Sequence, residues 1–297
     1  RNVVNMVIRM IDPGIDERIL DPACGSGGFL VESLRYVWNK LEEKAADLGW
    51  PESEIEAEKQ RIAIKNLRGI DKDSFLSKVA KAYLAILGDG RGGIHCENSL
   101  ESFHNWSAKT FEDIQPESFD VIVTNPPFGK KLSIDSTEIL ELYDLGHRWN
   151  SVPGGVFEKG ALADKQPPQL LFIERCFQML RPGGRMGIVL LESIFGMPKY
   201  QYVVNYIRLQ AKINAIVTLP EDLFQPHTHA KCCVLICQKY KKNESYSSCD
   251  NYDIFMSDVK WCGHDSRGNI TYSYTSTGEK VVLDEIPLVA DRYLEMR

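Results

Sequence analysis

The strongest constraint on the fold of this chain is a regular alternation of short apolar runs with longer segments of helical spacing. Runs of this length are typical of strands, and strands that alternate with helices form a mostly parallel sheet covered on both faces. Seven strands are expected. The second ends at residue 71, and the others lie at residues 18–20, 93–96, 119–123, 185–191, 213–219 and 231–238.

The last expected strand, 231–238, follows a connection that is too short to hold a crossover helix, residues 220–230. Parallel pairing needs a longer connection, so this strand is expected to pair antiparallel. The sequence therefore predicts an α/β fold with a seven-stranded, mostly parallel sheet, one antiparallel strand and helices on both faces. Helices are expected at 29–65 with a break near 48–51, and at 74–87, 168–180 and 200–210, whereas 129–165 is expected to be irregular.

A net charge of −6 excludes a chain that attracts nucleic acid through its overall charge. Any contact with nucleic acid then requires a local basic patch or a partner. No apolar run approaches the roughly 20 residues that span a bilayer, and no secretory signal is visible. Most of the eight cysteines lie in expected strands and helices, and their spacing is not that of a disulfide framework, so we expect reduced thiols in a cytoplasmic protein.

A glycine-rich loop, residues 21–28 with the sequence Asp-Pro-Ala-Cys-Gly-Ser-Gly-Gly, follows the first expected strand and opens a helix. Gly25 and Gly27 let the backbone turn sharply and approach a ligand closely. The loop lacks the Lys-Ser/Thr pair of a nucleotide P-loop, and the dinucleotide fingerprint also fails. Asp21 at its head suits a cationic or amine-bearing ligand better than a pyrophosphate.

Two polar residues follow the next two expected strands. Asp71 ends the second strand, where a carboxylate accepts hydrogen bonds from both ribose hydroxyls of an adenosine. The alternative is that Asp71 only caps the helix that begins near Ser74. Asn98 follows the third strand, where its amide suits an adenine edge, and the alternative is a plain turn residue.

The fourth expected strand closes on Asn125, Pro126, Pro127 and Phe128. The two prolines rigidify the backbone and remove two N–H donors. The Asn125 amide and a fixed carbonyl then form a two-acceptor pocket for an NH₂ group, beside an aromatic ring that can stack on a flipped base. No general base is required, because the amine loses its proton only after it has attacked. The alternative, a purely structural turn, does not need this order of residues.

Five residues near the end of the sequence invite a zinc interpretation: His227, His229, Cys232, Cys233 and Cys237. Their spacing matches no standard site, and three of them fall in an expected strand, so we predict packing and no metal. Cys24 in the glycine loop is interpreted as a small buried residue, with a reactive thiol as the alternative.

These motifs, in this order, resemble those of the amino-group methyltransferases, and most closely the modification (M) subunits of type I restriction-modification systems. The resemblance runs from residue 1 to about 239. It rests on residues 21–30, 69–73, 88–90, 98–100, 125–129, 180–185 and 219–224.

The resemblance implies an S-adenosylmethionine-dependent, Rossmann-like methyltransferase that methylates N6 of a flipped adenine in a specific DNA site. It implies that the glycine loop contacts the methionine part of the cofactor, that Asp71 holds the ribose and that Asn98 lies near the cofactor adenine. Asn125, Pro126, Pro127 and Phe128 would form the target-base site. The cofactor-binding set is Asp21, Ala23, Gly25, Gly27, Asp71 and Asn98.

Family chains carry a Thr-Pro-Arg segment just before the position of Val3, of which only Arg1 remains, and an upstream helical domain. We therefore expect residues 1–239 to be a methyltransferase catalytic domain truncated at its N-terminus, and 240–297 to be a C-terminal appendage of uncertain structure. The fragment alone is expected to bind cofactor weakly and to lack activity.

The resemblance also implies three partners: double-stranded DNA, a specificity (S) subunit that reads the sequence, and a restriction (R) subunit that translocates and cuts. The long loop after Phe128 carries basic residues that we expect at DNA phosphates, with a solvated loop as the alternative. Trp149 in that loop is expected either to stack on DNA or to pack locally. The basic residues are Lys130, Lys131, Arg148, Lys159 and Lys165.

Three other functions compete with this hypothesis: methylation of an RNA base, methylation of a protein glutamine, and a non-catalytic scaffold. Proteins that methylate glutamine usually carry Tyr after the two prolines, so Phe128 favours a base. The intact sequence of residues 125–128 argues against a loss of catalysis.

Overall fold

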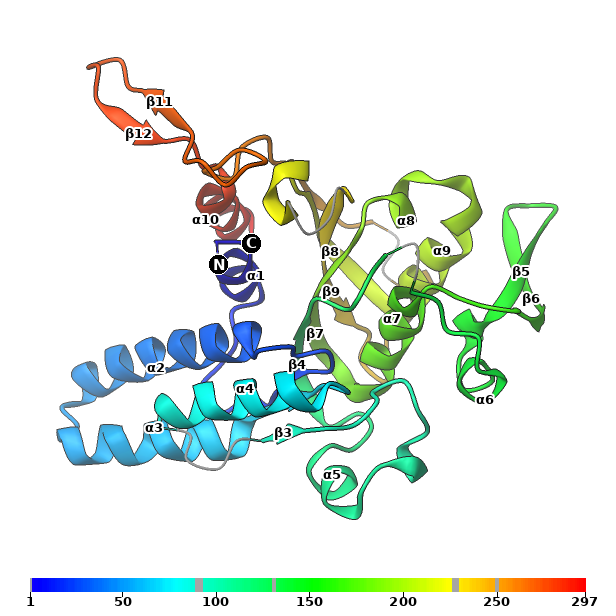
Figure 1. The fold of residues 1–297 in the computed structure, drawn as a ribbon, viewed down its shortest axis with the longest axis horizontal. Coiled ribbons are helices and arrows are strands. Elements are labelled where there is room, and N and C mark those ends of the chain that lie inside the picture. Colours follow the sequence, from blue (N-terminus) through cyan, green and yellow to red (C-terminus); the bar gives the residue numbers. More distant parts are fainter. Residues whose placement is uncertain (1, 89–92, 130–131, 226–229, 249–250) are drawn as a thin grey trace.

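A computed structural model of the chain describes residues 2–88, 93–129, 132–225, 230–248 and 251–297. Its centre is a sheet in the order β10-β8-β9-β7-β4-β1-β2-β3, with helices on both sides (Figure 1). This architecture confirms the expected α/β fold with a mostly parallel sheet. The strands are β1 (Ile19–Asp21), β2 (Leu67–Ile70), β3 (Ile94–His95), β4 (Phe119–Thr124), β7 (Leu180–Leu191), β8 (Ala211–Thr218), β9 (Cys232–Lys239) and β10 (Phe255–Asp258).

Strand β9 pairs antiparallel with β7 on one side and with β8 on the other, as the short connection before it predicted. The expected count of seven strands is corrected to eight in this sheet, because β10 adds to the edge and pairs parallel with β8. Strand β10 was missed because it is only four residues long and lies within a polar segment.

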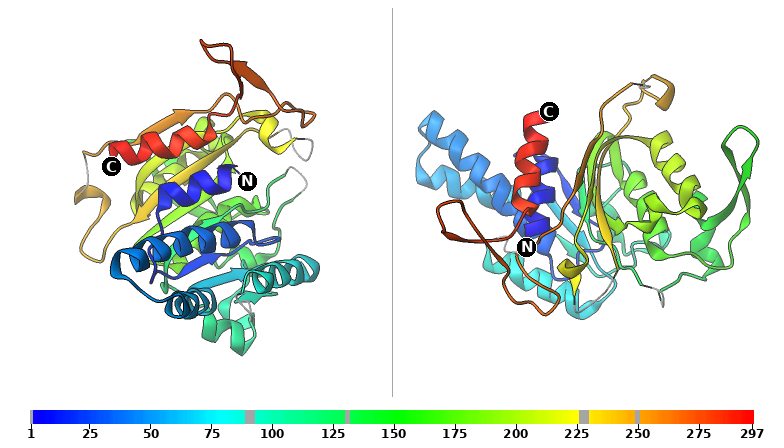
Figure 2. Two further views of the ribbon diagram at one scale, coloured as in Figure 1. Left: turned by 90° about the vertical axis from the view of Figure 1, so that its left-hand side faces the viewer. Right: turned by 90° about the horizontal axis from the view of Figure 1, so that it is seen from above.

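Two layers of helices cover the sheet. Helices α1, α2, α3, α4 and α10 lie on one face, and α7, α8 and α9 lie on the other (Figures 1 and 2). Among the described residues, no helix combines the length and the apolar character needed to cross a membrane. The helices are α1 (Asn2–Ile11), α2 (Gly28–Leu48), α3 (Glu52–Asn66), α4 (Ser74–Ile86), α5 (Ala108–Asp113), α6 (Thr137–Leu140), α7 (Pro168–Met179), α8 (Ser193–Gly196), α9 (Gln201–Gln210) and α10 (Ile286–Met296).

The helical layers follow from local signals in the sequence. The break expected near 48–51 is real, because α2 ends at Gly49 in the left-handed conformation and α3 begins after Pro51. Asp73 caps α4 by accepting hydrogen bonds from the amides of Phe75 and Leu76. Short 3₁₀ helices complete the secondary structure: η1 (Phe103–Asn105), η2 (Asp144–Gly146), η3 (Pro198–Tyr200), η4 (Glu221–Phe224) and η5 (Tyr246–Ser248).

Cysteines alternate between the two faces of β9. Cys232 packs with the layer of α1 and α10, whereas Cys233 and Cys237 pack with the layer of α7 and α9. Burial raises the pKa of all three thiols, which disfavours the thiolates that bind metal. The structure shows no metal-binding group of three ligands within its described ranges, and His227 and His229 lie outside them. The absence of a metal stays a prediction.

The long segment after Phe128 is not irregular throughout, which corrects the expectation for 129–165. It contains α6 and an antiparallel hairpin of β5 (His147–Val152) and β6 (Val156–Leu162). The hairpin turns at Gly154 and Gly155, both in the left-handed region. Its strands are mostly exposed and carry no apolar face, so the sequence shows no period-two signal.

The segment after residue 239 packs on the sheet and on α1. Helix α10 lies beside α1, where Arg9 pairs with Asp291 and Asn2 contacts Asp284 (Figure 2). A second hairpin, β11 (Tyr272–Tyr274) and β12 (Lys280–Val282), projects from the body (Figure 1). The domain boundary at 239 stays a prediction, although the sheet continues across it through β10.

We predict that replacing Gly187 by Ala lowers the free energy of unfolding by about 1–3 kcal/mol, because overpacking forces neighbours to shift. A Cβ atom on Gly187 of β7 would lie 2.6 Å from Cγ1 of Val7 and 3.2 Å from Cγ1 of Ile11, both on α1. Gly196→Ala is the matched control, since its Cβ would meet no atom within 4 Å. Urea unfolding measures both variants, and equal stabilities would contradict the close packing of α1 on β7.

Candidate functional site

The carboxyl ends of β1, β2 and β4 bring the predicted motifs together. Strand β1 lies between β2 and β4 and is parallel to both, so the loops that follow the three strands meet at one edge of the sheet. A cavity of about 430 Å³ opens there, within the size range of ligand sites. Its walls include six of the predicted site residues: Ala23, Gly25, Asp71, Asn98, Asn125 and Pro127.

The glycine loop is fixed by hydrogen bonds to the end of β2. The Cys24 amide donates to the Ile70 carbonyl at 2.9 Å, and the Gly25 amide donates to Oδ2 of Asp71 at 2.9 Å. Gly25 has a φ of +52°, and a side chain there would meet no protein atom within 4 Å. The loop therefore leaves open space against the cavity. Gly27 was expected to contact the cofactor, but it does not line this cavity. It has a left-handed backbone conformation and immediately precedes α2.

The Asp71 carboxylate organises the cavity wall. Its Oδ2 accepts from Gly25, and its Oδ1 accepts from the amide of Asp73 at 2.9 Å. Asp73 itself caps α4, so the interpretation of Asp71 as that cap is wrong. Asp71 is half-buried and borders the cavity, where its remaining lone pairs can accept further hydrogen bonds.

Asp21 lies beneath the glycine loop and not on the cavity wall, which differs from the contact expected for it. It is 1% exposed, and its Oδ1 accepts from Oγ1 of Thr124 at 2.7 Å and from the Ala23 amide at 3.0 Å. Burial raises the pKa of the Asp21 carboxyl to about 7; these hydrogen bonds oppose the rise, and the charge of Asp71 adds to it. The loop folds over Asp21, so its carboxylate positions the motif.

Cys24 is confirmed as a buried residue of the loop. It is 5% exposed, and burial raises the pKa of its thiol well above the ordinary value. Asn98 is a turn residue that also lies at the cavity, and its contact with an adenine stays a prediction. Its Oδ1 accepts from the Leu100 amide at 3.2 Å, as in a turn, while the residue also borders the cavity.

Asn125 lies at the edge of the cavity with an exposed side chain. Within the described ranges, that side chain makes no hydrogen bond, so its amide oxygen is available to a ligand. Pro126 is buried beneath it, which fixes the backbone. Phe128 is half-buried and contacts Phe224 edge to face, with ring centroids 6.2 Å apart.

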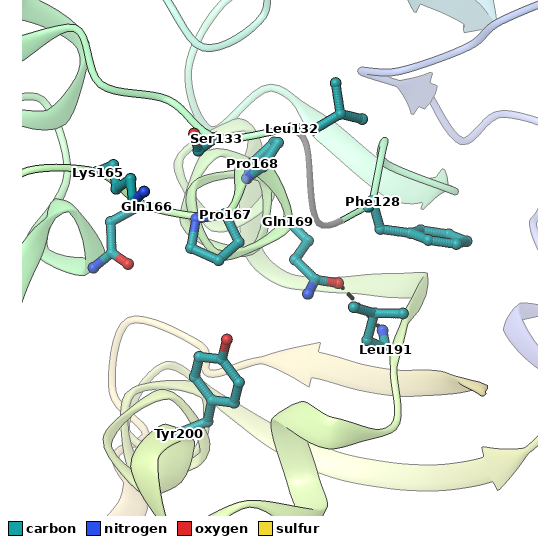
Figure 3. Close-up of a pocket in the computed structure, with 11 residues that line it drawn as sticks. Phe128, Leu132, Ser133, Lys165, Gln166, Pro167, Pro168, Gln169, Leu191 and Tyr200 are labelled. Atoms are coloured by element: carbon teal, nitrogen blue, oxygen red, sulfur yellow. Dashed lines mark hydrogen bonds between the residues drawn. The ribbon is translucent and has the colours of Figure 1, made fainter. Parts of the chain in front are cut away.

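A second cavity of about 320 Å³ adjoins the first (Figure 3). The two share Leu132, Ser133 and Pro168, and Phe128 borders the second. Gln169 is only 2% exposed, and its Oε1 accepts from the Leu191 amide at 3.2 Å. This bond fixes the orientation of the amide, and its Nε2 points into the cavity in Figure 3.

Gln169 and Tyr200 are among the residues of the second cavity that sequence reasoning missed. They follow ordinary helix starts, and no local pattern distinguishes a glutamine in the first turn of α7 from any other. Only the packing of α7 and η3 around one space identifies them.

The basic residues expected at DNA phosphates are not equivalent. Lys130 and Lys131 lie outside the described residues. Lys159 pairs with Asp144 at 2.7 Å, whereas Lys165 borders the second cavity. Trp149 packs locally, since its ring stacks on Tyr202 at 6.1 Å with an interplanar angle of 13°.

Comparison with known proteins adds an independent observation. Residues 1–269 match the family described as N-6 DNA Methylase. The EcoEI type I methylase subunit of Escherichia coli is 24% identical, over 96% of this chain and 54% of its own length. The MjaVII type I methylase subunit of Methanocaldococcus jannaschii is 27% identical, over 82% of this chain and 36% of its own length. The chain thus spans about half or less of these relatives.

Solved structures share the fold. The EcoKI M protein aligns with a TM-score of 0.58 and 20% identity, over 91% of this chain and 50% of that protein. The Type ISP restriction-modification enzyme LlaGI aligns with a TM-score of 0.66 and 15% identity, over 98% of this chain and 28% of that enzyme.

We predict that Asp21→Asn gains stability relative to the wild type as the pH rises from about 4 to about 7. The folded-state pKa of Asp21 is raised to about 7 from 3.8, so the folded protein holds a proton in this window that the unfolded chain has lost. The stability of the wild type therefore falls as the pH rises through this window, because only the unfolded chain has released the proton, and the fall ends once the folded carboxyl also ionises above about pH 7. Asn keeps the acceptor for Thr124 and Ala23 but cannot ionise.

Urea unfolding of both proteins at pH 5, 6, 7 and 8 measures this difference. We expect a change of more than about 1 kcal/mol across the window, since one pKa unit corresponds to about 1.4 kcal/mol. A difference that does not vary with pH would show that Asp21 is not the buried acid described here.

Proposed function

This chain belongs to the N-6 DNA Methylase family, and on that premise we propose that it transfers a methyl group from S-adenosylmethionine to N6 of a flipped adenine in DNA. The observation that carries the proposal is the exposed amide of Asn125, which bonds to none of the described residues and lies beside the cavity that Asp71 borders. A free acceptor for an amine and a carboxylate for a nucleoside thus face one space.

The first cavity suits the cofactor. Asp71 would accept from the ribose hydroxyls, and the open space at Gly25 admits a ligand against the loop backbone. Ala23 and Asn98 border the same space, and the buried Asp21 holds the loop in place. When bound, S-adenosylmethionine supplies a methyl group on a positively charged sulfur, which favours a nearby carboxylate.

Asn125 and the backbone of Pro126 would hold the target amine. The amide oxygen of Asn125 accepts one N–H and the Pro126 carbonyl accepts the other, which turns the nitrogen lone pair toward the methyl group. Phe128 borders the adjoining cavity and would stack on the base, and Pro127 keeps the loop rigid. The adjoining cavity supplies room for the base, with the Nε2 of Gln169 as a fixed donor for a ring nitrogen.

The whole protein is proposed to act as the modification subunit of a type I restriction-modification system. Two similar proteins are methylase subunits of type I restriction enzymes, which supports this assignment. Double-stranded DNA is then the substrate, and specificity and restriction subunits are the partners. Such a complex acts on chromosomal DNA, so the proposed location is the cytoplasm.

We predict that Asn125→Ala lowers the rate of methyl transfer by about 100-fold or more while cofactor affinity is retained, because one positioned hydrogen-bonding group contributes about that factor. Asp71→Ala is the matched variant, and it should weaken cofactor binding because it removes the acceptor at the cavity wall. Both are made in the full-length parent with its partner subunits.

Tritium transfer from labelled cofactor to DNA, RNA and protein measures activity, and calorimetry measures cofactor affinity. Transfer to RNA or protein with none to DNA would exclude the proposed substrate. If Asn125→Ala also loses cofactor binding, the assignment of Asn125 to the target-base site is wrong.

A further inference from the structure

A third cavity, of about 320 Å³, continues from the second. The two share Lys165, Gln166 and Tyr200. The rest of its wall comes from β5, from residues 163–164, from Lys199 of η3 and from the start of α9. A trough therefore leads from the space beside Phe128, past Tyr200, to the base of the hairpin.

The wall of this trough is built by contacts between distant segments. The ring of Trp149 on β5 stacks on Tyr202 of α9, and its Nε1 donates to the Asp144 carbonyl at 3.1 Å. Gln166 is 8% exposed, and its Nε2 donates to the Leu145 carbonyl at 2.9 Å. These contacts hold the hairpin in one position relative to α9.

Positive charge gathers in the trough, although the chain carries a net charge of −6. Lys165 and Lys199 make no ion pair in the part of the chain that the structure describes, and Lys199 lies 4.6 Å from the ring centroid of Tyr200. Arg148 pairs with Asp164 at 2.6 Å, but both side chains are exposed, so water weakens this pair. Asp164 is the one carboxylate in the lining, against three cationic side chains.

We propose that this trough binds the sugar-phosphate backbone of the DNA strand beside the flipped nucleotide, with Lys165 and Lys199 as its phosphate contacts. The inference rests on the proposed function, because it takes the second cavity as the site of the target base. A nucleotide flips by rotating about its own backbone, so the adjacent phosphates must lie at the mouth of the base site.

The chemistry of the trough fits a backbone and not a base edge. Lysines bind phosphates as point charges, and a positively charged groove follows the backbone of a strand. The contact is thus independent of sequence. Lys165 was expected at DNA from the sequence, whereas Lys199 joins it only through the fold. Lys159 was also expected at DNA, but it does not line the trough.

The test uses the double variant Lys165→Gln, Lys199→Gln in the full-length protein with its partner subunits. DNA affinity is measured by fluorescence anisotropy from 50 to 250 mM NaCl, on cognate and non-cognate duplexes. Each phosphate contact contributes about 0.9 to the slope of log affinity against log salt, so the slope should become less steep by nearly two units at most. Cofactor affinity should not change.

Lys159→Gln is the matched control, since it removes a lysine of the neighbouring hairpin that does not line the trough and that pairs with Asp144. It should leave the slope unchanged, and Lys165→Arg, Lys199→Arg should restore the wild-type slope.

If the double glutamine variant keeps the wild-type salt dependence of DNA affinity and still methylates DNA, the trough does not bind the DNA backbone, while the proposed function stands. A wild-type slope with weaker assembly of the subunits would also overturn this binding by the trough, and would assign the surface to an acidic protein partner. If the wild-type complex methylates RNA or protein and no DNA, the proposed function fails by that measurement alone.

Discussion

The carboxylate of Asp21 is the interaction on which the arrangement of the site depends. One oxygen accepts from the Ala23 amide and from the hydroxyl of Thr124, which lies 103 positions further along the chain. Thr124 immediately precedes Asn125, so this single buried group fixes the glycine loop relative to the Asn-Pro-Pro-Phe loop. Desolvation opposes its charge, and the hydrogen bonds offset that cost only while both loops stay in place.

The sheet makes such a centre possible because helices cover both of its faces. Side chains inside the layers are apolar, so polar groups gather where the parallel strands end. The turns after β1, β2 and β4 meet there, and Asp71 links two of them by accepting from Gly25 and from Asp73. Rigid strands thus position loops whose own sequences are short and polar.

Three adjoining cavities divide the proposed reaction into separate tasks. Asp71 borders the first, Phe128 the second and Lys199 the third. Neighbouring cavities share lining residues, such as Pro168 between the first two and Lys165 between the last two. In the proposed arrangement, a nucleotide held in the middle cavity would have the cofactor on one side and its own backbone on the other.

The sequence by itself determined the fold class, the antiparallel strand and the two loops of the site. These predictions rest on hydrophobic periodicity, on connection length and on the backbone properties of proline and glycine. Each of these acts over a few residues, so each can be recognised in the sequence before the fold is known. The tertiary structure decided what depends on contacts between distant segments. Asp21 is buried beneath its loop, and Asp73 caps α4. Gln169, Tyr200 and Lys199 line the cavities only because the fold places them there. The fold also ordered an exposed hairpin, whose strands lack an apolar face because solvent surrounds them, and the short edge strand β10, of whose four residues only Phe255 joins the core.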